Sequence, residues 1–173
     1  KAARPRTLPP PLSGIIVGNG LAYAAGNFRF PIFVLACLTT IVFQVLSNFA
    51  NDYGDGVKGT DNDDSLGPER MLQAGLISKK EMKRGVQITA LLGLLMSAWL
   101  IGLSFGEDQW IEILFFLGLG IASIVAAIKY TVGDTAYGYY ALGDLFVFLF
   151  FGGVSVMGSF YLQTMQLDLS LVF

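Results

Sequence analysis

The chain has 173 residues, of which 54% are hydrophobic and 14% are charged, against about 25% charged in an ordinary soluble domain. The net charge of −2 gives no indication of a nucleic-acid partner. The absence of histidine excludes histidine both as a catalytic acid or base and as a metal ligand. The single cysteine, Cys37, excludes a disulfide within the chain.

Five apolar stretches predict membrane-spanning helices, each of which needs about 20 apolar residues. We expect these helices at about 8–27, 31–52, 79–105, 109–129 and 143–164. The stretches are apolar on all sides, which favours helices over the alternating strands of a membrane barrel. The sequence therefore predicts an all-α integral membrane protein with a single membrane domain over residues 1–173.

Two local patterns refine this prediction. Ser78 and Glu81 have the spacing of a capping box at the start of the third helix. Two pairs of glycines four residues apart would allow helices to approach closely: Gly14 with Gly18, and Gly102 with Gly106.

The positive charges predict an orientation. If the five helices cross the membrane in turn, ten of the eleven Lys and Arg residues lie on one side of it and only Arg29 lies on the other. Because cytoplasmic segments of membrane proteins carry the excess of Lys and Arg, we expect the opposite side to be cytoplasmic. That side holds the N-terminal segment and the loops at about 53–78 and 130–142.

Polar side chains gather at the end of the second helix. Four of them share one helical face within an arc of about 100°: Asn48, Asn51, Asp52 and Asp55. Gln44 extends this face one turn deeper. Such groups at membrane depth usually face a bundle interior or a water-filled cavity. We expect the glycines at 54, 56 and 59 to end the helix and bring Lys58 and Asp61 to the same cavity mouth.

This combination of residues suits a metal and a phosphate together. Carboxylate and amide oxygens are the ligands that Mg²⁺ prefers, whereas Lys58 and Arg70 suit phosphate oxygens. The sequence therefore predicts a Mg²⁺–diphosphate ligand. The alternative is a solvated acidic loop, which is our interpretation of Asp63 and Asp64.

A second polar loop follows the fourth helix on the same predicted side. Lys129 suits a phosphate group, and the tyrosines that follow, including Tyr130 and Tyr139, would line an aromatic pocket or form an interfacial belt.

Three stretches resemble a known family. Residues 51–61, NDYGDGVKGTD, resemble the first aspartate-rich motif of the UbiA superfamily of intramembrane prenyltransferases, closest to the branch that prenylates 1,4-dihydroxy-2-naphthoate in menaquinone biosynthesis. Residues 67–75 and 130–144 resemble the same branch, and the similarity extends to about Gln163. The superfamily pattern has a third aspartate at the position of Gly59, whereas this chain has Asp61, a spacing that the branch shares.

The resemblance implies a bundle of about nine helices with a second aspartate-rich motif. These residues hold no such motif, so we expect them to be the N-terminal portion of a longer protein. The implied reaction is Mg²⁺-dependent transfer of a polyprenyl group from polyprenyl diphosphate to 1,4-dihydroxy-2-naphthoate, with decarboxylation. The implied location is the inner membrane of a bacterium, in contact with membrane lipid, with the active site facing the cytoplasm.

The resemblance also assigns roles to residues. The metal ligands would be Asn48, Asn51, Asp52, Asp55 and Asp61. The substrate-binding residues would be Lys58, Arg70, Lys129, Tyr130 and Tyr139. The residues closest to catalysis would be Asp55, Lys58 and Asp61.

Three other functions fit parts of the sequence. Another aromatic acceptor, such as 4-hydroxybenzoate, would use the same fold and mechanism. An ion-coupled transporter would use intramembrane Asp and Asn as cation ligands, though usually near the bilayer midplane. A CDP-alcohol phosphotransferase would share the spacing of Asp52 and Asp55, but the rest of its signature is missing here.

Overall fold

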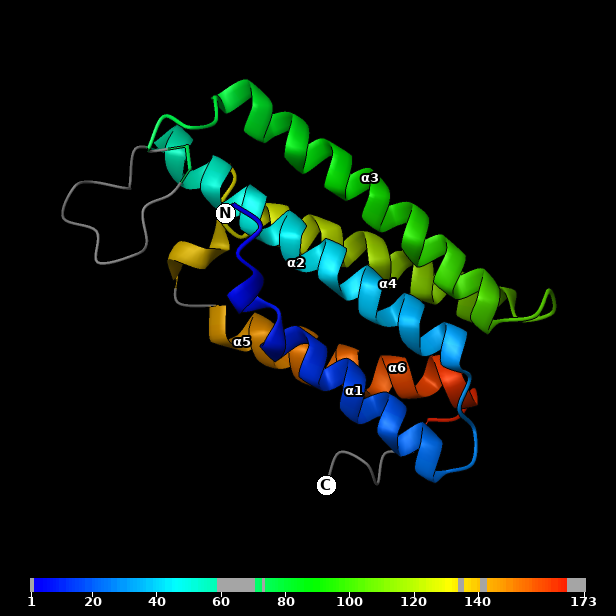
Figure 1. Cartoon of the computed structure of the whole chain (residues 1–173). Helices are drawn as coiled ribbons and strands as arrows, with labels where there is room; N and C mark the ends of the chain where they lie inside the picture. Colours follow the sequence, from blue (N-terminus) through cyan, green and yellow to red (C-terminus); the bar gives the residue numbers. More distant parts are fainter. Residues whose placement is uncertain (1, 59–70, 73, 134–135, 141–142, 168–173) are drawn as a thin grey trace.

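The computed structural model describes residues 2–58, 71–72, 74–133, 136–140 and 143–167, and within these every regular element is a helix (Figure 1). The first 58 residues hold η1 (Pro5–Thr7), α1 (Pro9–Ala24) and α2 (Phe30–Lys58). They are followed by α3 (Lys79–Ser104), α4 (Trp110–Lys129) and η2 (Tyr137–Tyr140). The last run joins α5 (Gly143–Val147), a π-helical segment η3 (Phe148–Val154) and α6 (Ser155–Thr164) without a break. The predicted all-α class is confirmed.

Four of these helical runs are long and apolar enough to cross a membrane. They are Phe30–Val57 within α2, the whole of α3 and α4, and the run Gly143–Thr164. Helix α1 has 16 residues, so at about 1.5 Å per residue it is shorter than the roughly 30 Å hydrocarbon core. The first of the five predicted spans is thus the shortest, and the prediction of nine helices stays a prediction.

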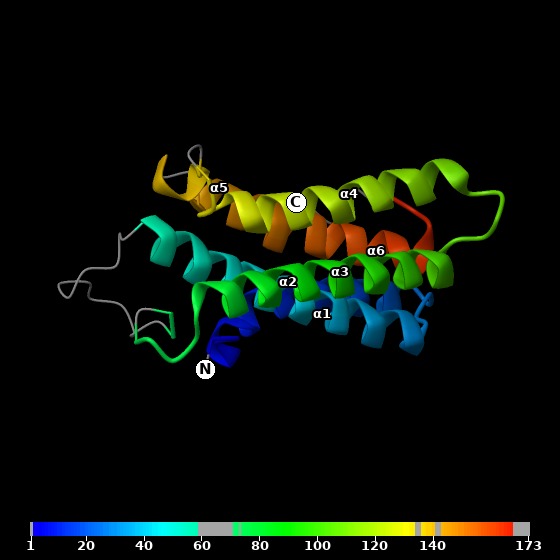
Figure 2. The ribbon, with the colours of Figure 1, turned by 90° about the horizontal axis from the view of Figure 1, so that it is seen from above.

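The helices pack side by side around α2. Helix α2 contacts α1, α3 and α4, and α1 also contacts α6 and η3. Figure 2 shows these helices running along nearly the same axis. A bundle of this kind encloses its interior with residues that are far apart in the sequence.

Helices α1 and α6 approach closely at two glycines. A Cβ atom at Gly14 would overlap Ser155, and one at Gly18 would overlap Ser159 and the carbonyl oxygen of Val156. The predicted close contact is therefore present at this pair. The other pair does not make one, because a Cβ at Gly102 would meet open space.

Helix α2 continues to Lys58, past the end predicted from its glycines. A Cβ at Gly54 would lie 2.6 Å from the carbonyl oxygen of Thr131, and one at Gly56 would overlap the side chain of Leu72. Gly54 is needed for close packing because it meets backbone atoms. Both glycines leave the helix unbroken, because glycine lowers helix stability by only about 1 kcal/mol.

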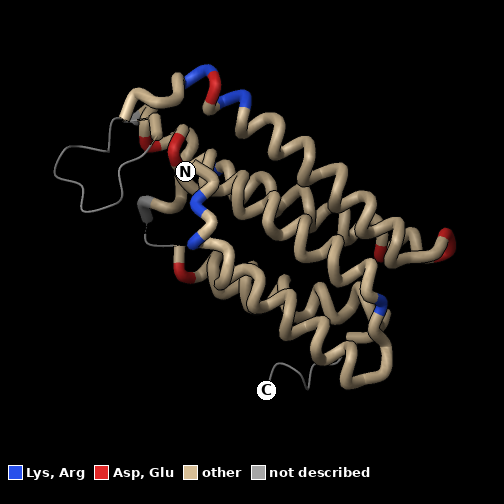
Figure 3. Tube along the Cα trace, in the orientation of Figure 1, with Lys and Arg blue, Asp and Glu red and all other residues tan. Residues whose placement is uncertain are grey.

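Charged residues divide the bundle into two ends. Figure 3 shows most of the Lys and Arg of the described residues near the N-terminus and the start of α3. The capping box predicted there is present, since the Ser78 hydroxyl accepts from the amide of Glu81 at 3.3 Å.

Arg29 lies at the opposite end, where it holds two helices together. Its guanidinium donates to the carbonyl oxygens of Ser104 at 3.2 Å and Leu162 at 2.9 Å, at the ends of α3 and α6. A positive charge at these ends is favourable because the carbonyl ends of helices carry partial negative charge. Beside it, the Gln163 amide donates to the Asn19 amide oxygen at 2.6 Å.

Candidate functional site

A cavity of about 400 Å³ lies inside the bundle, between α1 and the helices that follow it. Its walls are largely apolar and aromatic, with Phe43, Leu100, Phe116 and Phe150 among the lining residues. The volume is within the usual range for small-ligand cavities, about 300–1,000 Å³. The cavity therefore suits an apolar ligand or the apolar part of an amphiphilic one.

The hydroxyl groups on the cavity wall add little polarity. The hydroxyls of Thr39, Ser97 and Ser123 each donate to the carbonyl oxygen four residues earlier, at 2.8 Å. A side-chain hydroxyl bonded to its own helix is already satisfied and needs no ligand. The wall between the two ends of the cavity thus behaves as an apolar surface.

One end of the cavity is polar. Gln44, Ser47 and Asn51 of α2 line it there, together with Tyr130 and Tyr137 from the segment that follows α4. These residues lie near the same end of the bundle as the last turns of α2. The cavity thus joins an apolar interior to the polar end predicted from the sequence.

Asn51 is held in place by a hydrogen bond from the hydroxyl of Thr131. The Thr131 hydroxyl lies 3.1 Å from both the Asn51 side-chain oxygen and the carbonyl oxygen of Ala50. One turn further, Gly54 lets the backbone of α2 contact the backbone of Thr131 directly. The position of Asn51 at the cavity is therefore set by the turn after α4.

Asn48 and Asp52 lie on an adjacent face of α2 and contact the N-terminal segment. The Asn48 amide donates to the carbonyl oxygen of Ala3 at 2.8 Å and to the Thr7 hydroxyl at 3.0 Å. Asp52 is only 1% exposed and forms an ion pair with Arg4. Two of the predicted metal ligands are thus engaged with the start of the chain.

Asp55 is buried in the last turns of α2, one turn beyond Asn51. Asp61 and Arg70 lie outside the described residues, as does the side chain of Lys58. Within the part of the chain that the structure describes, no three acidic or sulfur ligands gather as a metal cluster. The oxygen donors of Asn51 and Asp55, on successive turns, are of the chemical kind that suits a hard divalent ion.

Aromatic rings line the polar end of the cavity. The rings of Tyr137 and Phe146 stack with centroids 4.1 Å apart, and Tyr130 meets Tyr137 edge to face at 5.4 Å. The Tyr137 hydroxyl donates to the carbonyl oxygen of Ala126 at 2.7 Å. Burial, with a smaller contribution from Tyr130, raises the pKa of Tyr137 to about 12, so the phenol stays protonated at neutral pH.

The two other predicted residues of this loop differ in their placement. Lys129 is exposed, and the side chain of Tyr139 lies outside the described residues. Tyr137 is one of the tyrosines for which the sequence left a pocket and an interfacial belt open, whereas Phe146 and Arg4 were not predicted as site residues. The spacing of these residues carries no signal for the cavity, because their partners lie on other helices.

The chain is a membrane-spanning helical bundle whose apolar cavity has a polar, oxygen-rich end. A cavity of this kind suits an amphiphilic ligand. The chain belongs to the UbiA prenyltransferase family, because the sequence pattern of that family matches residues 12–173. It is accordingly a multi-pass membrane protein. Prenyltransferases of this family generally depend on a divalent metal ion.

Several relatives are similar over nearly the whole chain. The 1,4-dihydroxy-2-naphthoate octaprenyltransferase of Haemophilus influenzae is 47% identical over 97% of this chain and 54% of its own length. The Escherichia coli protein of the same name is 46% identical over 99% and 55%. The UbiA prenyltransferase domain-containing protein 1 homolog of Drosophila melanogaster is 30% identical over 96% and 45%. The chain thus spans about half the length of these relatives, and no solved structure gives a significant match.

Proposed function

We propose that the protein transfers a polyprenyl group from polyprenyl diphosphate to 1,4-dihydroxy-2-naphthoate, a step of menaquinone biosynthesis. The allylic C–O bond breaks and diphosphate leaves. The acceptor ring forms a carbon–carbon bond to the prenyl group and loses its carboxyl group as CO₂, giving demethylmenaquinol. The names of the bacterial relatives support this acceptor, and the observation that carries the proposal is the apolar cavity ending at Asn51 and Tyr130.

The cavity wall performs two tasks in this reaction. It receives the prenyl tail, since the lining residues such as Phe116 and Phe150 are apolar. It also excludes water from the allylic cation that develops as the C–O bond breaks, which prevents hydrolysis. The stacked rings of Tyr137 and Phe146 offer a flat surface to an aromatic acceptor.

The diphosphate lies at the polar end, beside the last turns of α2. Asn51 and Asp55, with Asp61 from the loop, would hold Mg²⁺, which stabilises negative charge on the leaving diphosphate. Lys58, Arg70 and Lys129 would bind the phosphate oxygens. Because most Lys and Arg gather at this end, it faces the cytoplasm. The membrane in question is the inner membrane of a bacterium.

A prenyl-transfer assay on the full-length protein in nanodiscs tests the proposal. The reaction contains polyprenyl diphosphate, Mg²⁺ and either 1,4-dihydroxy-2-naphthoate or 4-hydroxybenzoate. We expect a prenylated naphthoquinol that disappears with EDTA and returns with Mg²⁺. Product from hydroxybenzoate alone would move the protein to another acceptor. Folded protein with no product from either acceptor, but with ion-driven uptake in proteoliposomes, would support a transporter.

A matched pair of variants tests the polar end. Asp55→Asn should reduce turnover by about 100-fold or more, because a carboxylate that would hold Mg²⁺ is lost and the leaving diphosphate is less stabilised. Asp108→Asn makes the same change at an exposed position between α3 and α4, at the opposite end of the bundle, and should leave turnover unchanged. Equal activity of the two variants would remove Asp55 from the site.

A further inference from the structure

The N-terminal arm, defined here as residues 2–7, lies along one polar face of α2. The carbonyl oxygen of Ala3 accepts from the Asn48 amide at 2.8 Å. The Thr7 hydroxyl lies 3.0 Å from the Asn48 amide nitrogen and 3.2 Å from that of Gln44. The arm is therefore docked on α2 by hydrogen bonds from successive turns of the helix.

The arm also brings a positive charge to a buried carboxylate. Arg4 pairs with Asp52, which is 1% exposed, while the Arg4 side chain is 23% exposed. A buried carboxylate is stable only when a cation or several donors stand beside it. Arg4 also has a backbone φ of 45°, in the left-handed region that non-glycine residues rarely adopt. Such strain persists only where surrounding contacts impose it, and it gathers at functional sites.

The end of α2 therefore has two polar faces. Asn51 and Asp52 are adjacent in the sequence, but successive helical residues point about 100° apart. Asp52 faces the arm through Arg4, whereas Asn51 faces the cavity and Thr131. A rotation of the helix end toward one partner would draw it away from the other.

We infer that Arg4 is a positioning residue: through Asp52 it fixes the rotation of the end of α2, and thereby places Asn51 at the cavity and Asp55 one turn beyond it. The role assigned to these two residues rests on the proposed function. In this assignment Asp52 is the partner of the arm and does not bind Mg²⁺.

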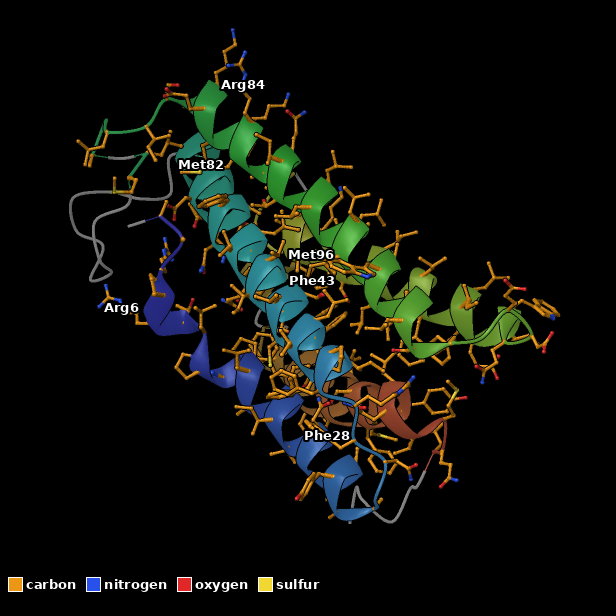
Figure 4. All side chains as sticks on the ribbon, turned by 45° about the vertical axis from the view of Figure 1, so that its right-hand side comes forward. Arg6, Phe28, Phe43, Met82, Arg84 and Met96 are labelled. Atoms are coloured by element: carbon orange, nitrogen blue, oxygen red, sulfur yellow. The ribbon has the colours of Figure 1, made fainter. Side chains whose placement is uncertain are left out.

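Arg6 provides a matched control in the same arm. It is exposed, and Figure 4 shows it pointing away from the bundle. Arg6→Gln removes the same charge from the same short element as Arg4→Gln, without touching the pair with Asp52. A general electrostatic effect of the arm would weaken both variants, whereas the inferred role concerns Arg4 alone.

The experiment compares Arg4→Gln, Asp52→Asn, the double variant and Arg6→Gln in the full-length protein in nanodiscs. For each we would measure kcat, KM for polyprenyl diphosphate and the Mg²⁺ concentration that gives half-maximal activity. The two single variants at the pair should each lose about tenfold or more in kcat/KM and require more Mg²⁺, because the metal-binding face is displaced. The double variant should recover most of this loss, since Gln and Asn can pair without a buried charge. Arg6→Gln should match the wild type.

Three results would overturn the inference. If the double variant is as defective as Asp52→Asn while Arg4→Gln is normal, Asp52 acts as a metal ligand. If Arg4→Gln and the double variant are equally defective with normal Mg²⁺ dependence, Arg4 acts on the diphosphate itself. If the single variants only melt at lower temperature and keep normal kinetics, the pair is merely structural.

A wild-type protein without prenyl-transfer activity would refute the proposed function and leave the positioning testable. Hydrogen exchange of residues 48–58 should then rise in Arg4→Gln and return toward normal in the double variant. Unchanged exchange in Arg4→Gln would show that the arm does not fix the end of α2.

Discussion

Gly54→Ala tests whether the contact between α2 and the turn after α4 controls the reaction. The added Cβ would lie 2.6 Å from the carbonyl oxygen of Thr131 and 2.7 Å from its carbonyl carbon. Neither atom can rotate away, because both belong to the backbone. Ordinary contact begins at 3.4 Å, so the helix and the turn must separate by about 0.8 Å.

This movement has a larger expected effect on activity than on stability. It stretches the 3.1 Å hydrogen bond from Thr131 to Asn51 and shifts Asn51 relative to the cavity. A misplacement of about 1 Å can reduce a rate about 100-fold, or roughly 2.7 kcal/mol of activation free energy. Overpacking costs about 1–3 kcal/mol of stability, and alanine in place of glycine in a helix returns about 0.5–1 kcal/mol.

The assay measures prenyl transfer and thermal unfolding for Gly54→Ala beside Gly20→Ala. Gly20 lies in α1, and a Cβ there would meet nothing within 4 Å. We expect Gly20→Ala to keep wild-type activity with equal or higher stability, and folded Gly54→Ala to lose about 100-fold in kcat/KM. A folded Gly54→Ala protein as active as Gly20→Ala would refute the coupling between this contact and the site.

Three further variants test contacts between the helices and the environment of Tyr137. Gly18→Ala should be about 1–3 kcal/mol less stable than Gly20→Ala in thermal unfolding, because its Cβ would overlap the carbonyl of Val156; equal stability would contradict the α1–α6 contact. Arg29→Gln should lower stability by about 1 kcal/mol through lost hydrogen bonds to helix ends, and an unchanged melting temperature would contradict that role. Stability should fall as pH rises from 10 toward 12, because the pKa of Tyr137 is raised to about 12 from 10 in the unfolded chain. Tyr137→Phe should remove this part of the fall, and an identical pH profile would contradict it.

The helices could be predicted from the sequence because lipid imposes a strong constraint on composition. An apolar stretch of about 20 residues has few alternatives to a helix in a bilayer. The capping box at Ser78 was likewise predictable, since both partners lie within one turn. The end of α2 was not, because the choice between a helix-ending and a close-packing glycine depends on Thr131, which is distant in the sequence.

The candidate site could be predicted only in part. Helical spacing placed Asn51 and Asp55 on one face and predicted a polar end to the second helix, but it could not tell which side chains face the cavity. Arg4 is 48 positions from Asp52, and nothing in the local pattern of either residue indicates the pair. The metal ligands predicted as one set therefore divide between two neighbours of the helix.

This division bears on how an acidic helix end can accept an anionic diphosphate. Asp52 and Asp55 lie within one turn of each other, and both are buried. Two such negative charges would repel a diphosphate, and Mg²⁺ would have to offset both. With Arg4 beside Asp52, one of the two charges is already balanced inside the protein. Mg²⁺ held by Asn51, Asp55 and Asp61 would then offset two carboxylate charges rather than three, and Lys58, Arg70 and Lys129 would supply the positive charge that binds the diphosphate.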